Sequence, residues 1–165
     1  MADDYKPKYV EIQLMGHIAH KGFQAGSLIG LLGVAPALAL RAGAVTADLV
    51  TRGAAYGALG GVALSLVLGV GKRATMDREG VEDRVYRLHH NKSQGRVDAL
   101  CSVGSTVGLA AAALLLHQGA SGRHPPAINL LGGAAAGCVA GLIAHMATRP
   151  AEMATPNRMM DYLKD

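Results

Sequence analysis

Four long stretches of the chain contain no Asp, Glu, Lys or Arg, and the charged residues gather between them. The hydrocarbon layer of a bilayer is about 30 Å thick, and a helix needs roughly 20 apolar residues to cross it. A soluble, alanine-rich four-helix bundle is the alternative, but it would need polar outer faces, and in the second stretch only Tyr56 and Ser65 are polar. The predicted membrane spans are residues 22–40, 53–71, 99–118 and 127–148.

Glycines recur in steps of four within these stretches. Residues four apart lie above one another on an α-helix, so each row forms a strip along one face. Such a strip weakens a helix in water, but within lipid it lets two backbones approach closely and gain van der Waals contact. We therefore expect an all-α fold, a bundle of four transmembrane helices held by a glycine zipper. The expected helix-packing residues are Gly22, Gly26, Gly30, Gly53, Gly57, Gly61, Gly69, Gly104, Gly108, Gly133, Gly137 and Gly141.

The remaining segments complete a single membrane domain of 165 residues. Residues 9–20 have helical apolar spacing and are expected to form a short interfacial helix before the first span. Residues 72–98 form a charged loop with pairs suited to a solvated helix, and residues 149–165 form a polar tail. Pro36 is expected to kink the first span, because proline removes a backbone donor. The order of span, short loop and span repeats on either side of the charged loop, which indicates a weak internal duplication.

Lys and Arg residues are distributed unevenly among the connections. With four spans, the N-terminal segment, the charged loop and the tail share one side, and together they hold thirteen of the sixteen Lys and Arg residues. The positive-inside rule places that side in the matrix of a mitochondrion or the cytoplasm of a bacterium. The first residues match neither a secretory signal nor an Arg-rich presequence, so targeting to an organelle is expected to be internal.

The charged loop holds the candidate docking residues. They are expected to bind a neighbouring subunit or an anionic phospholipid such as cardiolipin, and simple solvation of the loop is an equal alternative. The docking residues are Lys72, Arg73, Arg84, Arg87, Lys92 and Arg96. Nucleic acid is not an expected partner, because basic residues alternate with acidic ones and no aromatic stacking platform accompanies them.

Catalytic, cofactor and metal sites are not expected. No nucleophile and base stand at a recognisable spacing, no glycine motif fits a phosphate, and no His/Cys cluster suggests a metal. Cys101 and Cys138 are interpreted as small apolar groups within spans, and whether they form a disulfide stays open. His117 and His145 lie near span ends, where an ionisable group costs little, so a proton relay is the weaker interpretation. The lack of an acidic residue within any predicted span argues against an ion-coupled transporter.

Four short glycine-rich spans with polar ends resemble the mitochondrial inner-membrane translocase (Tim) superfamily, which includes a four-helix accessory subunit of respiratory complex I. The resemblance covers residues 22–148, and its best local match is Arg96 and Asp98 ahead of Gly104 and Gly108. It implies a non-catalytic accessory subunit of a respiratory complex in the mitochondrial inner membrane, complex I first, that braces other membrane subunits. The alternatives are a protein-import or solute-transport component of the Tim-like type and a free-standing bacterial membrane protein.

Overall fold

A computed structural model describes residues 8–119 and 125–150, and all regular secondary structure within them is helical. The expected all-α fold is therefore confirmed. The elements are α1 (Val10–Ile29), the π-helical turn η1 (Gly30–Val34), α2 (Ala35–Ala42), α3 (Ala47–Ala74), α4 (Arg78–His90), α5 (Lys92–His117) and α6 (Pro126–Ala147).

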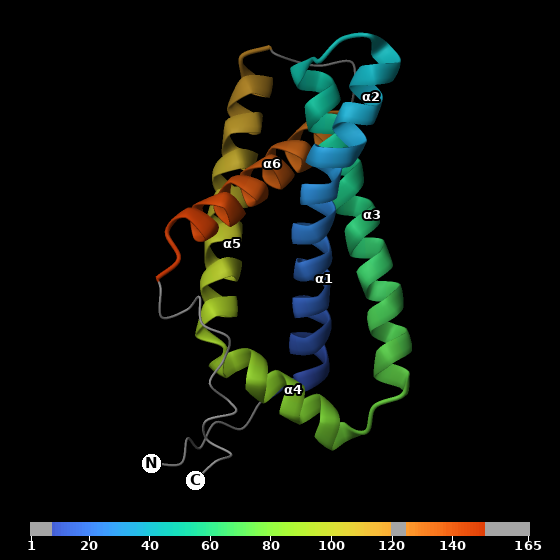
Figure 1. The fold of residues 1–165 in the computed structure, drawn as a ribbon, viewed down its shortest axis with the longest axis vertical. Helices are drawn as coiled ribbons and strands as arrows, with labels where there is room; N and C mark the ends of the chain where they lie inside the picture. The colour runs from blue at the N-terminus through green and yellow to red at the C-terminus, as the bar shows by residue number, and fades with distance from the viewer. Residues whose placement is uncertain (1–7, 120–124, 151–165) are drawn as a thin grey trace.

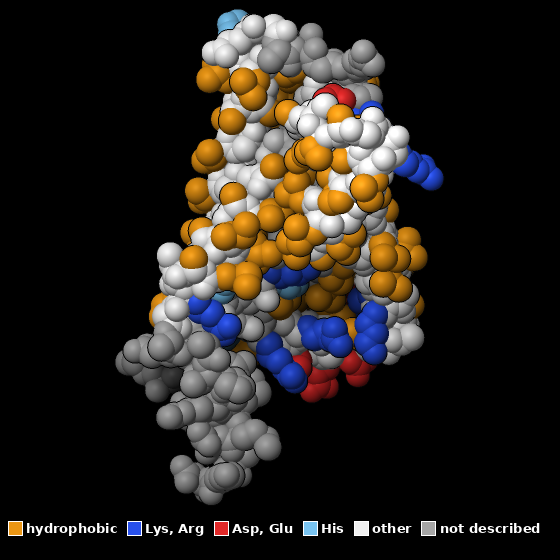
Figure 2. Space-filling model, turned by 45° about the horizontal axis from the view of Figure 1, so that its top comes forward, with side chains coloured by type: hydrophobic (Ala, Val, Ile, Leu, Met, Phe, Trp, Pro, Cys, Tyr) orange, Lys and Arg blue, Asp and Glu red, His pale blue; other side chains and the backbone are white. Residues whose placement is uncertain are grey.

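Four of these helices are long and apolar enough to cross a membrane, as in a multi-pass membrane protein. The first is the continuous run of α1, η1 and α2 over Val10–Ala42, and the others are α3, α5 and α6. Hydrophobic side chains are spread along the visible surface of the bundle, whereas most of the charged side chains gather at the end where α4 lies (Figure 2). This distribution fits a bundle whose middle part faces hydrocarbon. The end of the bundle that carries α4 then faces water.

The helices extend beyond the spans predicted from the uncharged stretches. Residues 9–20 do not form a separate interfacial helix, because α1 begins at Val10 and continues into the first span. Residues 72–98 contain a solvated helix, α4, as their charge pairs predicted, and in addition the end of α3 and the start of α5. Charge ends a hydrophobic stretch but not a helix, since helices continue into the headgroup region and the water beyond it. Of the predicted tail, only residues 149 and 150 are within the described part.

Short polar side chains cap the N-terminal ends of α3, α4 and α5, whose first residues the charge pattern did not predict. The Thr46 hydroxyl accepts a hydrogen bond from the Leu49 backbone N–H at the start of α3. Asp77 accepts one from the Gly80 N–H at the start of α4, and Asn91 does the same for the Gln94 N–H at the start of α5. Each side chain satisfies a backbone donor that the first helical turn leaves without a partner.

The break expected at Pro36 takes the form of a π-helical turn. Pro36 lacks the N–H that would bond four residues back. Just before it, the Ala35 N–H bonds to the Gly30 carbonyl, five residues back. This wider turn shifts the hydrogen-bond ladder ahead of the proline, and the helix then continues to Ala42.

The bundle consists of two helical hairpins joined by α4. Helices α1 and α3 run side by side, and α6 crosses α5 obliquely and also contacts α3 and α1 (Figure 1). Helix α4 lies across one end of the bundle. Its buried Val81 and Val85 pack on Leu14 of α1, and a second small core joins Ala54 and Ala58 of α3 to Ala135 of α6.

Candidate functional site

The first hairpin is held by a row of glycines on each helix, which we call the α1–α3 seam. Gly22 and Gly26 of α1 and Gly30 of η1 face the α3 row, which consists of Gly53, Gly57 and Gly61. A Cβ atom on Gly26 would lie 2.9 Å from the Gly61 Cα, and one on Gly30 would lie 2.5 Å from the Gly53 carbonyl oxygen. The backbones are therefore in direct contact, and a methyl group at these positions would force them apart.

The second hairpin uses the same device across an oblique crossing, which we call the α5–α6 seam. Gly104 and Gly108 of α5 meet Gly137 and Gly133 of α6. A Cβ on Gly104 would lie 3.0 Å from the Gly137 carbonyl carbon, and one on Gly141 would lie 2.9 Å from the Cα of the α5 residue Cys101. The structure thus places eleven of the twelve expected packing glycines in the two seams.

Two further glycines make contacts outside these seams. Gly69, the twelfth expected residue, faces Ile18 of α1, where an added Cβ would lie 2.9 Å from a side-chain methyl carbon. Gly132 of α6 packs on Thr51 of α3, and a Cβ there would lie 2.9 Å from the Thr51 carbonyl carbon. Sequence reasoning missed Gly132 because it stands outside the rows of four. The Gly132–Gly133 doublet was the available signal, since adjacent residues face two different neighbours on a helix.

A polar bridge joins the two hairpins through the side chain of Asp98 on α5. Its carboxylate accepts hydrogen bonds from Lys21 Nζ at 2.5 Å and from Gln24 Nε2 at 2.8 Å. His17 Nδ1 lies 3.6 Å from the other carboxylate oxygen. The side chains of Lys21 and Asp98 are only 30% and 22% exposed. An ion pair that is removed from water in this way needs such additional hydrogen bonds to offset its desolvation.

Sequence reasoning did not connect these four residues. It considered Asp98 only together with Arg96, ahead of Gly104 and Gly108. The available signal was the spacing of His17, Lys21 and Gln24, which are three or four residues apart and so share one face of α1. A helical face that is polar just where a span begins needs a partner from another helix.

Arg96 fastens the end of α6 to the start of α5. One guanidinium nitrogen lies 3.2 Å from His145 Nδ1, and the other donates to the Thr148 hydroxyl at 2.7 Å. His145 is only 5% exposed, so it lies inside the protein, while His117 is exposed at the end of α5. Arg96 was predicted as a docking residue, but its guanidinium is engaged within the chain.

The six predicted docking residues fall into two groups. Arg73 donates two hydrogen bonds from Nε to the Glu11 carboxylate, at 2.9 and 2.7 Å, and Arg87 Nε donates to Asp83 at 3.1 Å. With Arg96, three of the six are thus engaged inside the chain. The other three side chains are exposed and make no hydrogen bond or ion pair with any residue that the structure describes. These are Lys72, Arg84 and Lys92.

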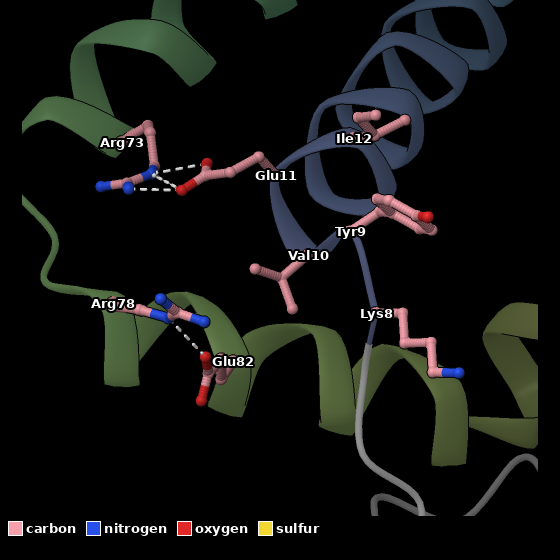
Figure 3. Close-up of a pocket in the computed structure, with 8 residues that line it drawn as sticks. All are labelled: Lys8, Tyr9, Val10, Glu11, Ile12, Arg73, Arg78 and Glu82. Carbon is pink, nitrogen blue, oxygen red and sulfur yellow. Dashed lines mark hydrogen bonds and ion pairs between the residues drawn. The ribbon is translucent and has the colours of Figure 1, made fainter.

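A pocket of about 650 Å³ opens where α1 begins, α3 ends and α4 passes beneath them. In Figure 3 the Arg73–Glu11 pair spans from α3 to α1, and Arg78 pairs with Glu82 along α4. Val10 points between α1 and α4. Because each arginine here faces a carboxylate, the described lining of the pocket has little net charge. Among these lining residues, only Lys8, at the edge, is a cation without a carboxylate partner in the described part of the chain.

The cysteines and the potential metal ligands are the remaining candidates for chemistry. Cys101 and Cys138 are both buried and are free thiols. Within residues 8–119 and 125–150, no three His, Cys, Asp or Glu side chains come together in a way that could hold a metal ion.

These features define a class: a multi-pass helical membrane protein built from two glycine-packed hairpins that a polar bridge joins. The chain belongs to the family described as "Protein of unknown function (DUF1757)", whose model matches residues 6–148. No curated protein matches the sequence.

Proposed function

We propose that this chain is a non-catalytic structural subunit of a larger membrane complex and that it braces its neighbours through the outward face of α5. The carrying observation is how little of α5 the chain itself covers. Of the most apolar 18-residue window of each span, 6% is buried in α5 and 28% in each of the other three. Val103, Val107 and Leu114 of α5 are 61%, 63% and 57% exposed.

The outward face of α5 suits close contact with another helix. Ser102, Thr106 and Ala110 follow one another in steps of four on its exposed side. The Thr106 hydroxyl donates to the Ser102 carbonyl at 2.9 Å, so it needs no other partner within lipid. Small residues in such a row allow a neighbouring backbone to approach closely. The glycine rows are occupied inside the two hairpins, which leaves this row available to a neighbour.

The charged end supports a second contact of the same subunit. Lys72, Arg84 and Lys92 present free positive charge near α4, where α3 ends and α5 begins. Positive side chains at the edge of the hydrocarbon attract anionic phospholipid headgroups, each contributing about 1 kcal/mol. The proposed partners are therefore other membrane subunits together with anionic phospholipid such as cardiolipin.

The resemblance to the translocase superfamily selects the complex within this proposal. It favours an accessory subunit of a respiratory-chain complex in the mitochondrial inner membrane, complex I first. The excess of positive charge at the α4 end then orients that end, with both chain termini, toward the matrix.

Native-gel separation of membranes dissolved in a mild detergent, followed by mass spectrometry, tests the proposal. We expect the chain to migrate with a much larger assembly. Thr106→Trp, on the outward face of α5, should release it to its own small mass. Leu68→Trp, on the exposed face of α3, is the matched control and should leave the assembly intact. A wild-type chain that migrates alone contradicts the proposal, as does a Thr106→Trp variant that stays in the assembly.

One observation favours the alternative, a protein-import or solute-transport component. The polar bridge lies between the two hairpins, where a conducting path would run. Purified protein in vesicles separates the two functions: ion flux through the wild-type chain that changes in an Asp98→Asn variant would support transport. Tight vesicles would support the structural role.

A further inference from the structure

A crevice of about 530 Å³ lies between α3, α5 and α6, at the end of the bundle away from α4. Its walls are mostly glycine and alanine, including Ala111 and Ala112 of α5 and Ala136 and Ala140 of α6. The α5–α6 seam forms its floor, because Gly108 is among the lining residues. Since α6 crosses α5 obliquely (Figure 1), the helices separate beyond the seam, and such small side chains cannot fill the space between them.

The crevice has a polar end. Asp48 and Thr51 from the start of α3 and Asn129 from the start of α6 line it there. The Thr51 hydroxyl donates to the Ala47 carbonyl at 2.8 Å. Asn129 Nδ2 is shielded from solvent, and so from the crevice as well, and it has no hydrogen-bond partner among the described residues. A rotation of the amide about its Cβ–Cγ bond would bring this donor to the crevice. A buried amide donor left unpaired costs about 1–3 kcal/mol, so the site favours an occupant that carries an acceptor at this end.

The surroundings of the crevice limit what can enter it. Ala111, Leu115 and Ala140 stand at its mouth and are exposed. Because these residues lie within spans, the mouth faces hydrocarbon, where the neighbouring molecules are lipid chains and water is absent. An empty hollow would forfeit the dispersion contacts of its walls. Its volume falls in the range of about 300–1,000 Å³ that is typical of small-molecule sites.

We infer that the crevice holds one acyl chain of a bilayer glycerophospholipid, with the ester carbonyl of that chain at the end formed by Asn129. The apolar walls accept the hydrocarbon, and the amide nitrogen donates to the carbonyl oxygen. The depth agrees as well, because Asn129 and Thr51 lie near the ends of two spans, and ester carbonyls lie at the edge of the hydrocarbon. The acyl chain would then fill the space between α3, α5 and α6.

Native mass spectrometry tests this site with a stated probe. The chain is placed in nanodiscs of one synthetic phosphatidylcholine with ester-linked chains and then released into the gas phase. We expect one retained lipid per wild-type chain. Ala136→Leu and Ala140→Leu fill the crevice and should lower retention to the background of loosely bound lipid. Ala113→Leu is the matched control, because Ala113 is exposed on α5 outside the crevice, and it should retain the lipid.

A second comparison tests the hydrogen bond. The ether-linked analogue lacks the carbonyl, so the wild-type chain should retain it several-fold less than the ester form, and Asn129→Leu should abolish that difference. Far-UV circular dichroism checks that each variant is folded. If both leucine variants unfold, the ester and ether comparison on the wild-type chain decides alone. The inference is overturned by a wild-type chain that retains no lipid, by folded Ala136→Leu and Ala140→Leu variants that retain it fully, or by equal retention of the two lipids.

Discussion

The two hairpins use the same sequence device and reach different degrees of closure. In the α1–α3 hairpin, three glycines of one helix meet three of the other, and Gly69 extends the contact to Ile18. In the α5–α6 hairpin, α5 contributes only Gly104 and Gly108 to the seam. Both seams are close backbone contacts over several helical turns, but the α5–α6 seam adjoins a crevice that also borders α3. The same glycine device therefore closes one hairpin and leaves a space beside the other.

The largest effect should come from the longer seam. In Gly57→Ala, the new methyl group would lie 2.6 Å from the Gly30 backbone nitrogen, and we expect a loss of about 3 kcal/mol in the free energy of unfolding, because overpacking moves backbone. Gly60→Ala is the matched control on the same helix, since nothing lies within 4 Å of its Cβ position. Reversible unfolding in detergent micelles measures both. Equal effects of the two substitutions would show that the seam is not a direct backbone contact.

A smaller loss should follow when the link between the hairpins is broken. Asp98→Asn removes the charge that pairs with Lys21, and we expect about 2 kcal/mol of destabilisation, because Lys21 stays partly buried without its counter-ion. Lys21→Met and the double variant complete a double-mutant cycle. Asp83→Asn, which breaks an exposed pair on α4, should cost only about 0.3–0.5 kcal/mol. A coupling between Asp98 and Lys21 no larger than that would contradict the polar bridge.

The smallest of the three effects is expected at the α5–α6 seam. Gly108→Ala would press a methyl group against the Gly133 carbonyl oxygen, 3.0 Å from the carbonyl carbon. We expect a loss of about 1 kcal/mol, because Gly108 borders the crevice and the helices there have room to shift. Gly95→Ala, which has open space around its Cβ position, is the control. The same unfolding measurement applies. A loss at Gly108 as large as that at Gly57 would mean that the two hairpins are equally tight.

The spans and their packing faces could be predicted from the sequence because both depend on local spacing. Four uncharged stretches give the helices, and the glycine rows give the faces, since helical geometry fixes which residues align. Which row faces which was not predictable from one row alone, because a strip of glycine fits any other strip. In the structure, each row faces the row of the span that is next to it in the chain. Gly26 of the first span contacts Gly57 of the second, and Gly108 of the third contacts Gly133 of the fourth.

The features that the sequence did not reveal depend on contacts between distant segments. Lys21 and Asp98 are 77 residues apart, and nothing in the sequence around either residue identifies the other as its partner. The charge pairs of residues 72–98 indicated a solvated helix, but not where it begins. Asp77 and Asn91 are ordinary N-cap residues and could have marked the starts of α4 and α5. The crevice has no sequence signature, because it results from the angle at which two helices cross.

The length of the first helical run has a practical consequence for determining which way the protein sits in its membrane. A helix of 33 residues is about 50 Å long, whereas a bilayer with its headgroups is about 40–45 Å thick. Because the charged side chains gather at the end where α4 packs, we expect that end of the run to protrude from the lipid and to hold α4, with its arginine side chains, in the aqueous phase. A protease that cuts after basic residues, added to sealed vesicles or to organelles with an opened outer membrane, would reach α4 from one compartment only. The size of the fragments would then report sidedness without any engineered tag.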